Sequence, residues 1–401
     1  MDLNEDPRDA AFRAEVRAFI EANLPEEVAA RIRASHHPSV PDRAFWTRKL
    51  YDKGWSAPHW PVEQGGPGWT AMQRHIFEEE MILHDAPPRC FQNFNLIGPL
   101  IYTFGSDAQK AEYLPKILKG ETFFAQGFSE PGSGSDLASL KTRAERDVDD
   151  YVINGQKIWT SDAHQYDMLF LLARTQFDGK PQAGISMFLF PTNTPGVDVR
   201  KIVTLDGRHA TNEVFLDNVR IPATARLGEE NKGWTYAKAL LNNERTFSAE
   251  VPSSKRDLAM LKRNAAKAKR YGRPLIEDPE FAARLARVEI DLMALEYAVL
   301  RVVQETSGTN ANAVASVLKV RGSEIRQRVA DLLVEALQEL GLVYFQDQEH
   351  PQEPFDPGMP PDVGPAPGIT ATALFRRVTT IYGGSNEIQR NLIAKNILEL
   401  G

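Results

Sequence analysis

The sequence predicts an α+β chain in which a helical region is followed by a sheet and then by a second helical region. The main observation is the hydrophobic period, which becomes strand-like near Gln126 and returns to helical spacing after Gly233. Length agrees with this division, because 401 residues with 42% hydrophobic content suggest two or three domains. We place the domains at residues 1–123, 124–230 and 231–401.

The first region opens with an amphipathic helix from Asp6 to Leu24. Asp6 fits the N-cap of this helix, and Pro7 fits its first turn, where a missing N–H is tolerated. The apolar residues that recur at helical spacing are Phe12, Val16, Phe19, Ile20 and Leu24.

The central region, from about Gln126 to Gly228, is rich in β-branched and aromatic runs typical of strands. Asn154-Gly155 predicts a hairpin turn, since both residues tolerate the backbone angles of tight turns. The runs are YVINGQKIWTS, MLFLLART, ISMFLFP, VDVRKI and NEVFLDNVRIP.

Helical patterns fill the third region, apart from a stretch from Pro351 to Gly368. That stretch holds seven prolines and three glycines, too many for a helix interior. We interpret it as an ordered surface excursion or a flexible loop between two helices. A tolerated insertion is favoured over a functional lid.

Composition excludes several classes of function. A balance of 47 basic against 54 acidic residues gives a net charge of −7, which argues against nucleic acid as the main partner. Cys90 is the single cysteine, so no intramolecular disulfide can form. The sequence has no apolar run of membrane-spanning length and no basic leader, so we expect a cytoplasmic protein without stable membrane insertion. The histidines show no spacing typical of metal ligands, so we expect no metal.

Two neighbouring segments suggest one wall of a binding site for a flat ligand. GFSEPGSGSD, from Gly127 to Asp136, is rich in Gly and Ser, so its backbone can approach a ligand closely. NGQKIWTSD follows from Asn154 to Asp162 and places Trp159 two residues before Ser161. On an extended strand, residues two apart share a face, so these two side chains are expected to cover the same ligand.

With a third segment, IYGGSNEIQRNLIA from Ile381 to Ala394, these motifs resemble the acyl-CoA dehydrogenase family. The resemblance extends to WPVEQGGPGW at Trp60–Trp69 and FGSDAQKAEYLPKILKG at Phe104–Gly120. It implies an N-terminal helical domain, a β-barrel-like central domain and a C-terminal four-helix bundle. It also implies FAD as cofactor, an acyl-CoA substrate in which an α,β double bond is formed, and an electron-transfer flavoprotein as electron acceptor.

The expected general base departs from the commonest family pattern. Many members carry a Glu directly after the Tyr of the C-terminal motif, where this chain has Gly383. A second group resembles LLNNERT, present here at Leu240–Thr246, which makes Glu244 the candidate base and Arg245 a candidate active-site neighbour. Gly383 keeps its backbone N–H, which in the family helps to hold the thioester carbonyl. Glu244 as an ordinary solvated helix carboxylate is the alternative.

Other roles follow from the resemblance position by position. Ser129 matches a hydroxyl near the flavin pyrimidine edge, Ser161 one near N5, and Trp159 the aromatic residue against the ring. The cofactor-binding set is completed by Phe128, Gly134, Ser135, Gln338, Ser385 and Glu387. The substrate-binding set is Ser135, Asn242, Arg245, Tyr382 and Gly383, with the pocket wall sought among Asn93, Phe94, Asn95 and Leu96.

One departure leaves the assembly open. The family's pyrophosphate-binding arginine, three residues before a Phe-Gly or Tyr-Gly pair, is Ala268 here, ahead of Tyr271-Gly272. The nearby cations Lys267, Lys269 and Arg270 either form a solvated face or supply a shifted phosphate contact. The chain is therefore expected as a homodimer, a homotetramer or a hetero-oligomer with a paralogous chain.

Two other classes of function stay open beside the dehydrogenase. The chain is alternatively a non-catalytic or partner subunit that binds CoA esters or completes the FAD site. Related oxidase or monooxygenase chemistry is a third reading. The substrate is not fixed, although the Glu244-type base and the Gly-Gly turn resemble members that act on bulky, branched, dicarboxylic or ring-bearing CoA esters.

Overall fold

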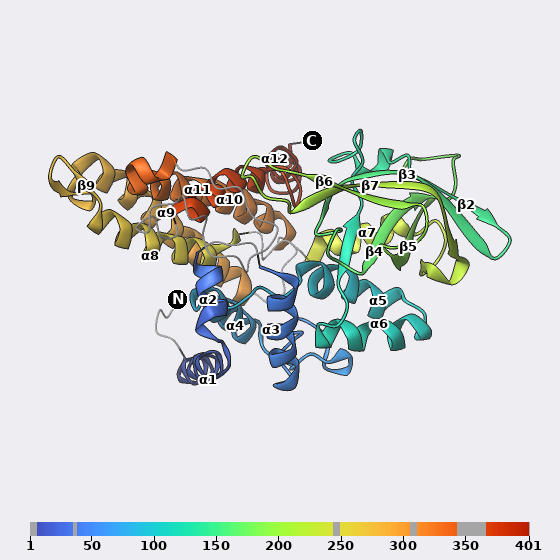
Figure 1. Ribbon diagram of the computed structural model, residues 1–401, viewed down its shortest axis with the longest axis horizontal. Helices are drawn as coiled ribbons and strands as arrows, with labels where there is room; N and C mark the ends of the chain where they lie inside the picture. Colours follow the sequence, from blue (N-terminus) through green and yellow to red (C-terminus); the bar gives the residue numbers. More distant parts are fainter. Residues whose placement is uncertain (1–5, 35–37, 244–248, 305–310, 343–365, 401) are drawn as a thin grey trace, which may run out of the picture.

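The computed structural model describes residues 6–34, 38–243, 249–304, 311–342 and 366–400. In Figure 1, the sheet formed by the middle of the sequence lies at one end of the molecule and the C-terminal helices lie at the other. The N-terminal helices lie beneath both. The predicted order of helices, sheet and helices is confirmed.

The N-terminal region is helical, as its hydrophobic period predicts. Asp6 caps the first helix by accepting a hydrogen bond from the backbone N–H of Arg8, and Pro7 occupies the first turn. Phe12, Val16 and Ile20 form its buried face. The helices are α1 Pro7–Asn23, α2 Glu26–Arg33, α3 Val40–Asp52, α4 Ala71–Leu83, the π-helix η2 Gln92–Ile97, α5 Gly98–Phe104 and α6 Asp107–Lys119.

The central region forms one open sheet rather than a closed barrel. Its strands are β1 Phe124–Gly127, β2 Arg143–Asp147, β3 Asp150–Ser161, β4 Met168–Arg174, β5 Ile185–Pro191, β6 Val197–Ile202, β7 Thr211–Pro222 and β8 Arg226–Leu227. The order is β6-β7-β3-β2-β4-β5-β8, with β1 parallel to β4. The end strands β6 and β8 are not paired with each other, so the expected barrel-like domain is not closed.

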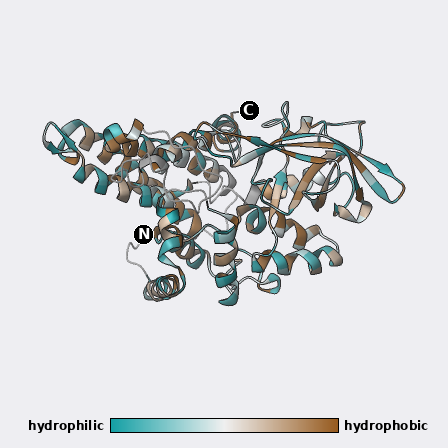
Figure 2. Cartoon of the chain, in the orientation of Figure 1, coloured by the Kyte–Doolittle hydropathy of each residue, from teal (hydrophilic) through white to brown (hydrophobic). Residues whose placement is uncertain are grey.

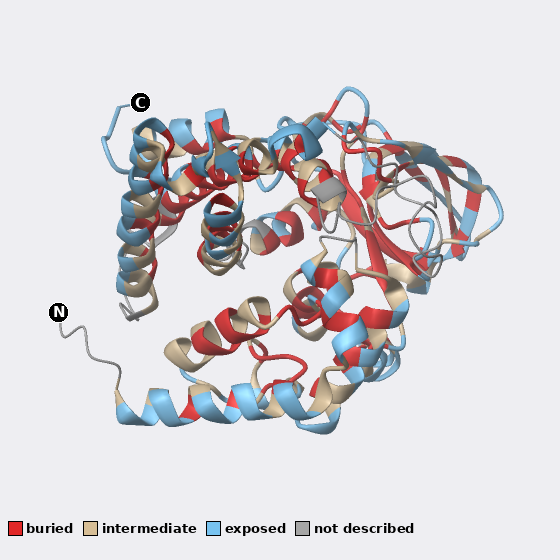
Figure 3. Ribbon diagram, turned by 60° about the vertical axis from the view of Figure 1, so that its left-hand side comes forward, coloured by how far each residue is buried: buried red, intermediate tan, exposed pale blue. Residues whose placement is uncertain are grey.

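Strands β4 and β5 are buried on both faces, which explains their predominantly apolar sequences. Alternate residues of β4 belong to different cores: Phe170 packs with α5 and α6, whereas Leu171 packs with β3 and β7. Figure 2 shows the apolar colouring of these strands, and Figure 3 shows that they are buried. The sheet is therefore a rigid platform for the loops at its edges.

The hairpin predicted at Asn154-Gly155 is wrong. Both residues lie inside β3, where the pairing with β7 shifts register between Ile153 and Gly155. The turn joins β2 and β3 earlier, between Asp147 and Asp150. Glycine is required at 155 for space, because a Cβ there would lie 2.5 Å from Thr142 Oγ1. Asn154-Gly155 lies opposite a bulge in β7, which advances three residues here while β3 advances two.

The C-terminal region is built around α10 Ala311–Leu337, which contacts the four helices α8, α9, α11 and α12. These are α8 Val251–Lys267, α9 Pro279–Gln304, α11 Ala366–Phe375 and α12 Asn386–Asn396, and α7 Gly233–Asn243 leads into them from the sheet. A two-stranded ribbon, β9 Lys269–Arg270 and β10 Arg273–Pro274, joins α8 to α9. Of the Pro-rich stretch, residues 351–365 lie outside the described residues, and α11 begins at Ala366.

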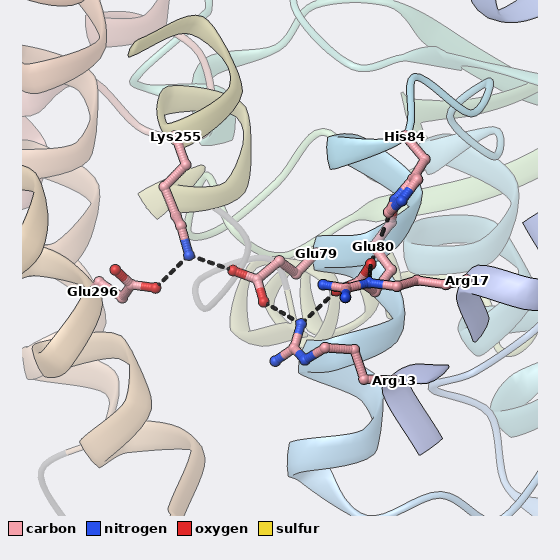
Figure 4. A network of polar contacts seen from close by, with 7 residues as sticks. All are labelled: Arg13, Arg17, Glu79, Glu80, His84, Lys255 and Glu296. Atoms are coloured by element: carbon pink, nitrogen blue, oxygen red, sulfur yellow. Dashed lines mark hydrogen bonds and ion pairs between the residues drawn. The ribbon is translucent and has the colours of Figure 1, made fainter. Parts of the chain in front are cut away.

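An ionic network joins the two helical regions (Figure 4). On α4, Glu79 accepts hydrogen bonds from Arg13 of α1 and from Lys255 of α8, both at 2.7 Å. Lys255 also donates to Glu296 of α9 at 2.7 Å, and Glu80 is fully buried between Arg13 and Arg17. The N-terminal helices are thereby fastened to the C-terminal helices through one shared carboxylate.

Candidate active site

The first two sequence motifs meet at one edge of the sheet. The backbone N–H of Ile158 on β3 donates to the carbonyl oxygen of Ser129 at 2.9 Å. Ser129 directly follows Phe128, whose ring is buried against Phe170 of β4. The Gly/Ser loop is therefore laid along the same part of β3 that carries Trp159.

A buried ion pair reinforces this junction, and the sequence reasoning missed it. Lys157 is fully buried and donates to Glu130 Oε1 at 2.8 Å and to the Phe128 carbonyl at 3.1 Å. Strand parity offered a signal, since Lys157 lies an even number of residues from the inward-facing Tyr151 and Ile153. A lysine on the inward face of a strand requires a partner.

Trp159 is exposed, and its backbone departs from a regular strand. Its φ is +60°, and the pairing of β3 with β7 is irregular between Lys157 and Thr160. The simple alternation assumed for Trp159 and Ser161 therefore does not hold, because a bulge moves the buried position to Thr160. Trp159 is nevertheless 59% exposed, two positions before the half-buried Ser161.

The Gly/Ser loop leaves space for a ligand. Gly134 and Ser135 are exposed, and no atom lies within 4 Å of the place where a Cβ on Gly132 or Gly134 would be. Ser133 is buried instead, and its hydroxyl donates to the Asp136 carbonyl at 2.8 Å. The loop is thus held from within while its outer glycines remain approachable.

The third motif turns sharply before α12. Gly383 and Gly384 have φ values of +64° and +80°, and Ser385 caps α12 by accepting from the N–H of Ile388. No atom lies within 4 Å of the place that a Cβ on Gly383 would occupy, so this part of the turn is uncrowded. Glu387 lies in the exposed first turn of α12, where backbone hydrogen bonding lowers the pKa of its carboxyl.

Tyr382 connects this turn to the chain that follows α7. Its hydroxyl donates to Glu250 Oε1 at 3.2 Å, and Glu250 also pairs with Arg326 of α10. A Cβ on Gly322 would lie 2.5 Å from the carbonyl oxygen of Ala249, so α10 closely contacts the residue before Glu250. Sequence reasoning missed Glu250, for which no motif gave a signal.

The candidate base and its neighbour belong to the part of the chain that the structure does not describe. Glu244 and Arg245 lie outside the described residues, and Asn242 is described only as part of the backbone of α7. Ala249 and Glu250 are the first described residues after this gap. The part of the site that includes the base therefore stays a prediction.

A buried lysine supports the start of α12. Lys319 of α10 donates to Asn386 Oδ1 at 2.9 Å, and the Asn386 amide donates to the Ser323 hydroxyl at 3.1 Å. Burial lowers the pKa of Lys319 to about 8. These contacts fix the helix that begins directly after the Gly383-Gly384 turn.

Gln338 and the basic run meet at the far end of the C-terminal helices. The Gln338 amide donates to the Lys269 carbonyl at 2.6 Å, and Ala268 ends α8 just before that residue. Arg270 is held by Glu335 at 2.9 Å, so it is committed to an ion pair within the chain. A shifted phosphate contact by Lys267 or Lys269 stays a prediction.

The residues considered for the pocket wall belong largely to the core. Asn93 is buried, accepts from the N–H of Phe124 at 3.0 Å and donates to the Thr122 carbonyl at 2.6 Å. Phe94 and Leu96 lie in the apolar core beneath the sheet. Their π-helical segment leads directly into α5.

His164, weighed at the sequence level as a pocket wall or loop residue, stacks on His209 with ring centroids 3.7 Å apart. Asn212 donates to one ring nitrogen of His164 at 3.2 Å and to the Thr160 carbonyl at 2.9 Å. Among the described residues, no cluster of three His, Cys, Asp or Glu side chains could hold a metal ion.

The described edge fits the isoalloxazine ring of FAD. An aromatic side chain as exposed as Trp159 leaves a large apolar surface uncovered, which a stacked flat ring would bury. Ser129 and Ser161 are half-buried residues on the two segments that Ile158 joins, and a serine hydroxyl can hydrogen-bond to polar ring atoms. The site therefore offers both the apolar cover and the polar groups that such a ring requires.

Within the described part of the chain, no helix is long and apolar enough to cross a membrane.

Three family models match the chain in succession. They are the acyl-CoA dehydrogenase N-terminal domain over residues 6–121, the middle domain over 125–219 and the C-terminal domain over 231–398. The acyl-CoA dehydrogenase IpdE1 of Mycobacterium tuberculosis is 35% identical over 400 residues, which cover 97% of each chain.

Solved structures agree along the full length. The ChsE4-ChsE5 complex from Mycobacterium tuberculosis matches with a TM-score of 0.82 and 32% identity, covering 100% of this chain and 99% of that chain. The Tcur3481-Tcur3483 steroid ACAD matches with a TM-score of 0.83 and 31% identity over 100% of both chains. On these matches, the chain is an oxidoreductase that belongs to the acyl-CoA dehydrogenase family.

Proposed function

We propose that the chain is an FAD-dependent acyl-CoA dehydrogenase that converts an acyl-CoA thioester to its trans-2-enoyl-CoA. Glu244 removes the α-proton, and the electrons pass on to an electron-transfer flavoprotein. The observation that carries the proposal is the junction of Ser129 with Ile158, which places the Gly/Ser loop beside the exposed Trp159.

The chain's own residues meet the demands of α-proton removal in this proposal. The α-proton of a thioester is weakly acidic, so a base needs help from hydrogen bonds that stabilise negative charge on the carbonyl oxygen. The N–H of Gly383 supplies one, and the absence of a side chain leaves room for a carboxylate that arrives from Glu244. When bound, FAD supplies the acceptor for the β-hydride.

The substrate class we propose is a bulky CoA ester with a ring. Two observations support it: the base position and Gly-Gly turn resemble members that act on bulky, branched, dicarboxylic or ring-bearing esters, and one matched structure is described as a steroid ACAD. Gly383 adds to this support, because open space surrounds the position that a Cβ would occupy. Ser135, Asn242, Arg245 and Tyr382 are the proposed substrate contacts.

A second candidate is a subunit that needs a partner chain to retain FAD. Ala268 in place of the expected arginine favours it, and so does the match to the ChsE4-ChsE5 complex. In this reading the partner supplies the missing pyrophosphate contact. Glu387 and Gln338 would then complete the site on this chain's side, contacting the ribose or the adenine end.

The deciding experiment is the visible spectrum of the purified chain before and after anaerobic addition of a mixed panel of CoA esters. A yellow protein that bleaches with one ester supports a self-sufficient dehydrogenase. A colourless protein that turns yellow only with a co-expressed paralogous chain supports the partner-dependent form. Stable yellow colour with no bleaching by ring-bearing, branched or straight-chain esters would contradict the dehydrogenase proposal.

A further inference from the structure

A fully buried lysine lies directly behind the proposed flavin edge, and the proposed chemistry makes no use of it. Lys157 of β3 has no exposed surface. Its ammonium donates to the carbonyl oxygen of Phe128 at 3.1 Å and to Glu130 Oε1 at 2.8 Å. Burying a charged group is costly, and an apolar residue would fill the same space without that cost.

The two contacts of Lys157 lie on either side of Ser129. The ammonium binds the carbonyl of the residue before Ser129 and the side chain of the residue after it. The next residue of β3, Ile158, binds the Ser129 carbonyl with its N–H at 2.9 Å. Three consecutive loop residues are therefore fixed by two consecutive strand residues, and Trp159 comes next.

Glu130 also binds the segment that leads from the Gly/Ser loop into β2. Its carboxylate accepts from the backbone N–H of Lys141 at 2.6 Å and from that of Thr142 at 2.9 Å. Burial raises the pKa of Glu130, but the charge of Lys157 and these hydrogen bonds outweigh it and hold the pKa below its ordinary value. One carboxylate thus ties the Gly/Ser loop both to the residues just before β2 and to β3.

We infer that Lys157 and Glu130 act as positioning residues for the flavin, by holding the Ser129 hydroxyl and the Gly/Ser loop in register with Trp159. The inference rests on the proposed function, because it assigns the flavin to this edge. Neither side chain touches the cofactor in this arrangement, since Lys157 has no exposed surface and Glu130 is 8% exposed. They act through the backbone of the residues that do.

The test compares the full-length chain with three variants: Lys157→Met, Glu130→Gln and the double variant. Each single variant is expected to weaken FAD binding by about tenfold or more, as for the loss of one well-placed hydrogen bond. The absorption maxima of the flavin that remains bound are expected to shift, because the polar groups at the ring edge are displaced.

The double variant separates positioning from stability. Each single change leaves one buried charge without its partner, whereas the double change removes both charges. Resistance to urea is therefore expected to recover in the double variant. Its FAD affinity is expected to stay low, because the ion pair between β3 and the Gly/Ser loop is still missing. Recovery of both together would overturn the inference and leave a purely structural pair.

Tyr151→Phe is the matched control on the same strand. It removes the hydroxyl of a buried tyrosine that donates to Glu230 at 2.8 Å and accepts from Arg226 at 3.0 Å, away from the Gly/Ser loop. FAD affinity and the flavin spectrum are expected to stay as in the unmodified chain. A control that weakened FAD as much as Lys157→Met would show that any damage to β3 suffices, and would overturn the inference.

A measurement without cofactor distinguishes this inference from the proposed function. Amide hydrogen exchange of the flavin-free chain is expected to rise over residues 128–142 in Lys157→Met and to stay unchanged in Tyr151→Phe. Unchanged exchange there would overturn the positioning role whether or not FAD binds. If the exchange rises as expected but no form of the protein takes up FAD, the proposed function fails. The conclusion that Lys157 and Glu130 order the Gly/Ser loop then still stands.

Discussion

The hydroxyl of Tyr382 lies 3.2 Å from the carboxylate of Glu250, to which it donates a hydrogen bond across 132 positions of sequence. This contact joins the turn that carries Gly383 to the chain that follows α7. The turn and Glu250 are thereby fixed to the middle of α10, where Arg326 pairs with Glu250.

Tyr382→Phe is expected to lower the free energy of unfolding by about 1 kcal/mol, the net value of one hydrogen bond. Urea unfolding measures this difference. Tyr271→Phe is the control, because Tyr271 is 97% exposed. Combining Tyr382→Phe with Glu250→Gln should cost less than the sum of the two single changes, and strict additivity would argue against the contact.

Glu244→Gln is expected to keep FAD and lose reduction of the flavin by substrate, because an amide cannot accept the α-proton. Anaerobic bleaching of the flavin band measures the loss. Glu280→Gln, at an exposed position on α9, should bleach normally. Normal bleaching by Glu244→Gln would reject this residue as the base.

Trp159→Ala is expected to reduce the FAD that co-purifies with the chain, since the ring loses its apolar cover. The ratio of flavin to protein absorbance measures the content. Trp159→Phe should retain most of the cofactor, because a smaller aromatic ring still covers part of the flavin. Equal FAD content in the Ala and unmodified proteins would count against stacking.

Gly155→Ala is expected to destabilise the chain by about 1–3 kcal/mol, the usual cost of overpacking a filled site. The added Cβ would lie 2.8 Å from the Cα of Thr142 as well as close to its hydroxyl. Gly132→Ala is the control, with open space around the added methyl group. Thermal unfolding compares the two, and equal melting temperatures would contradict the close approach.

The free energy of unfolding should vary with pH because Lys157 is buried. Burial lowers its pKa from 10.5 to about 8, so between these values the unfolded chain holds the proton more tightly than the folded chain. The contribution of Lys157 to stability is therefore greatest above pH 10.5 and is lost as the pH falls through about 8. Lys157→Met should remove this slope, which urea titrations across the window would reveal.

Much of the architecture could be predicted from local patterns. The helix from Pro7 to Asn23 follows from its cap and its apolar period, and the strands follow from their β-branched runs. The bulges in the pairing of β3 with β7 could not be predicted, because they depend on two strands that are far apart along the chain. Asn154-Gly155 was misjudged for this reason: the dipeptide suits a turn, but tertiary pairing decides between a turn and a bulge.

The candidate site was predictable to a similar degree. Its first two motifs do come together, through the hydrogen bond between Ile158 and Ser129. The residues that hold them together were not singled out: strand parity pointed to an inward-facing Lys157, but its partner Glu130 lies 27 positions away in a loop and carried no local signal. Glu250 was missed likewise, because its partner Tyr382 is distant in sequence.

The shared carboxylate between the helical regions has a consequence for how the molecule comes apart. Glu79 is bound by Arg13 on one side and Lys255 on the other, and it is only 5% exposed. Separating α1 or α8 from α4 would take away one of the two cations that neutralise this poorly hydrated carboxylate. Heating should therefore melt the two helical regions in a single calorimetric transition, although they lie at opposite ends of the sequence.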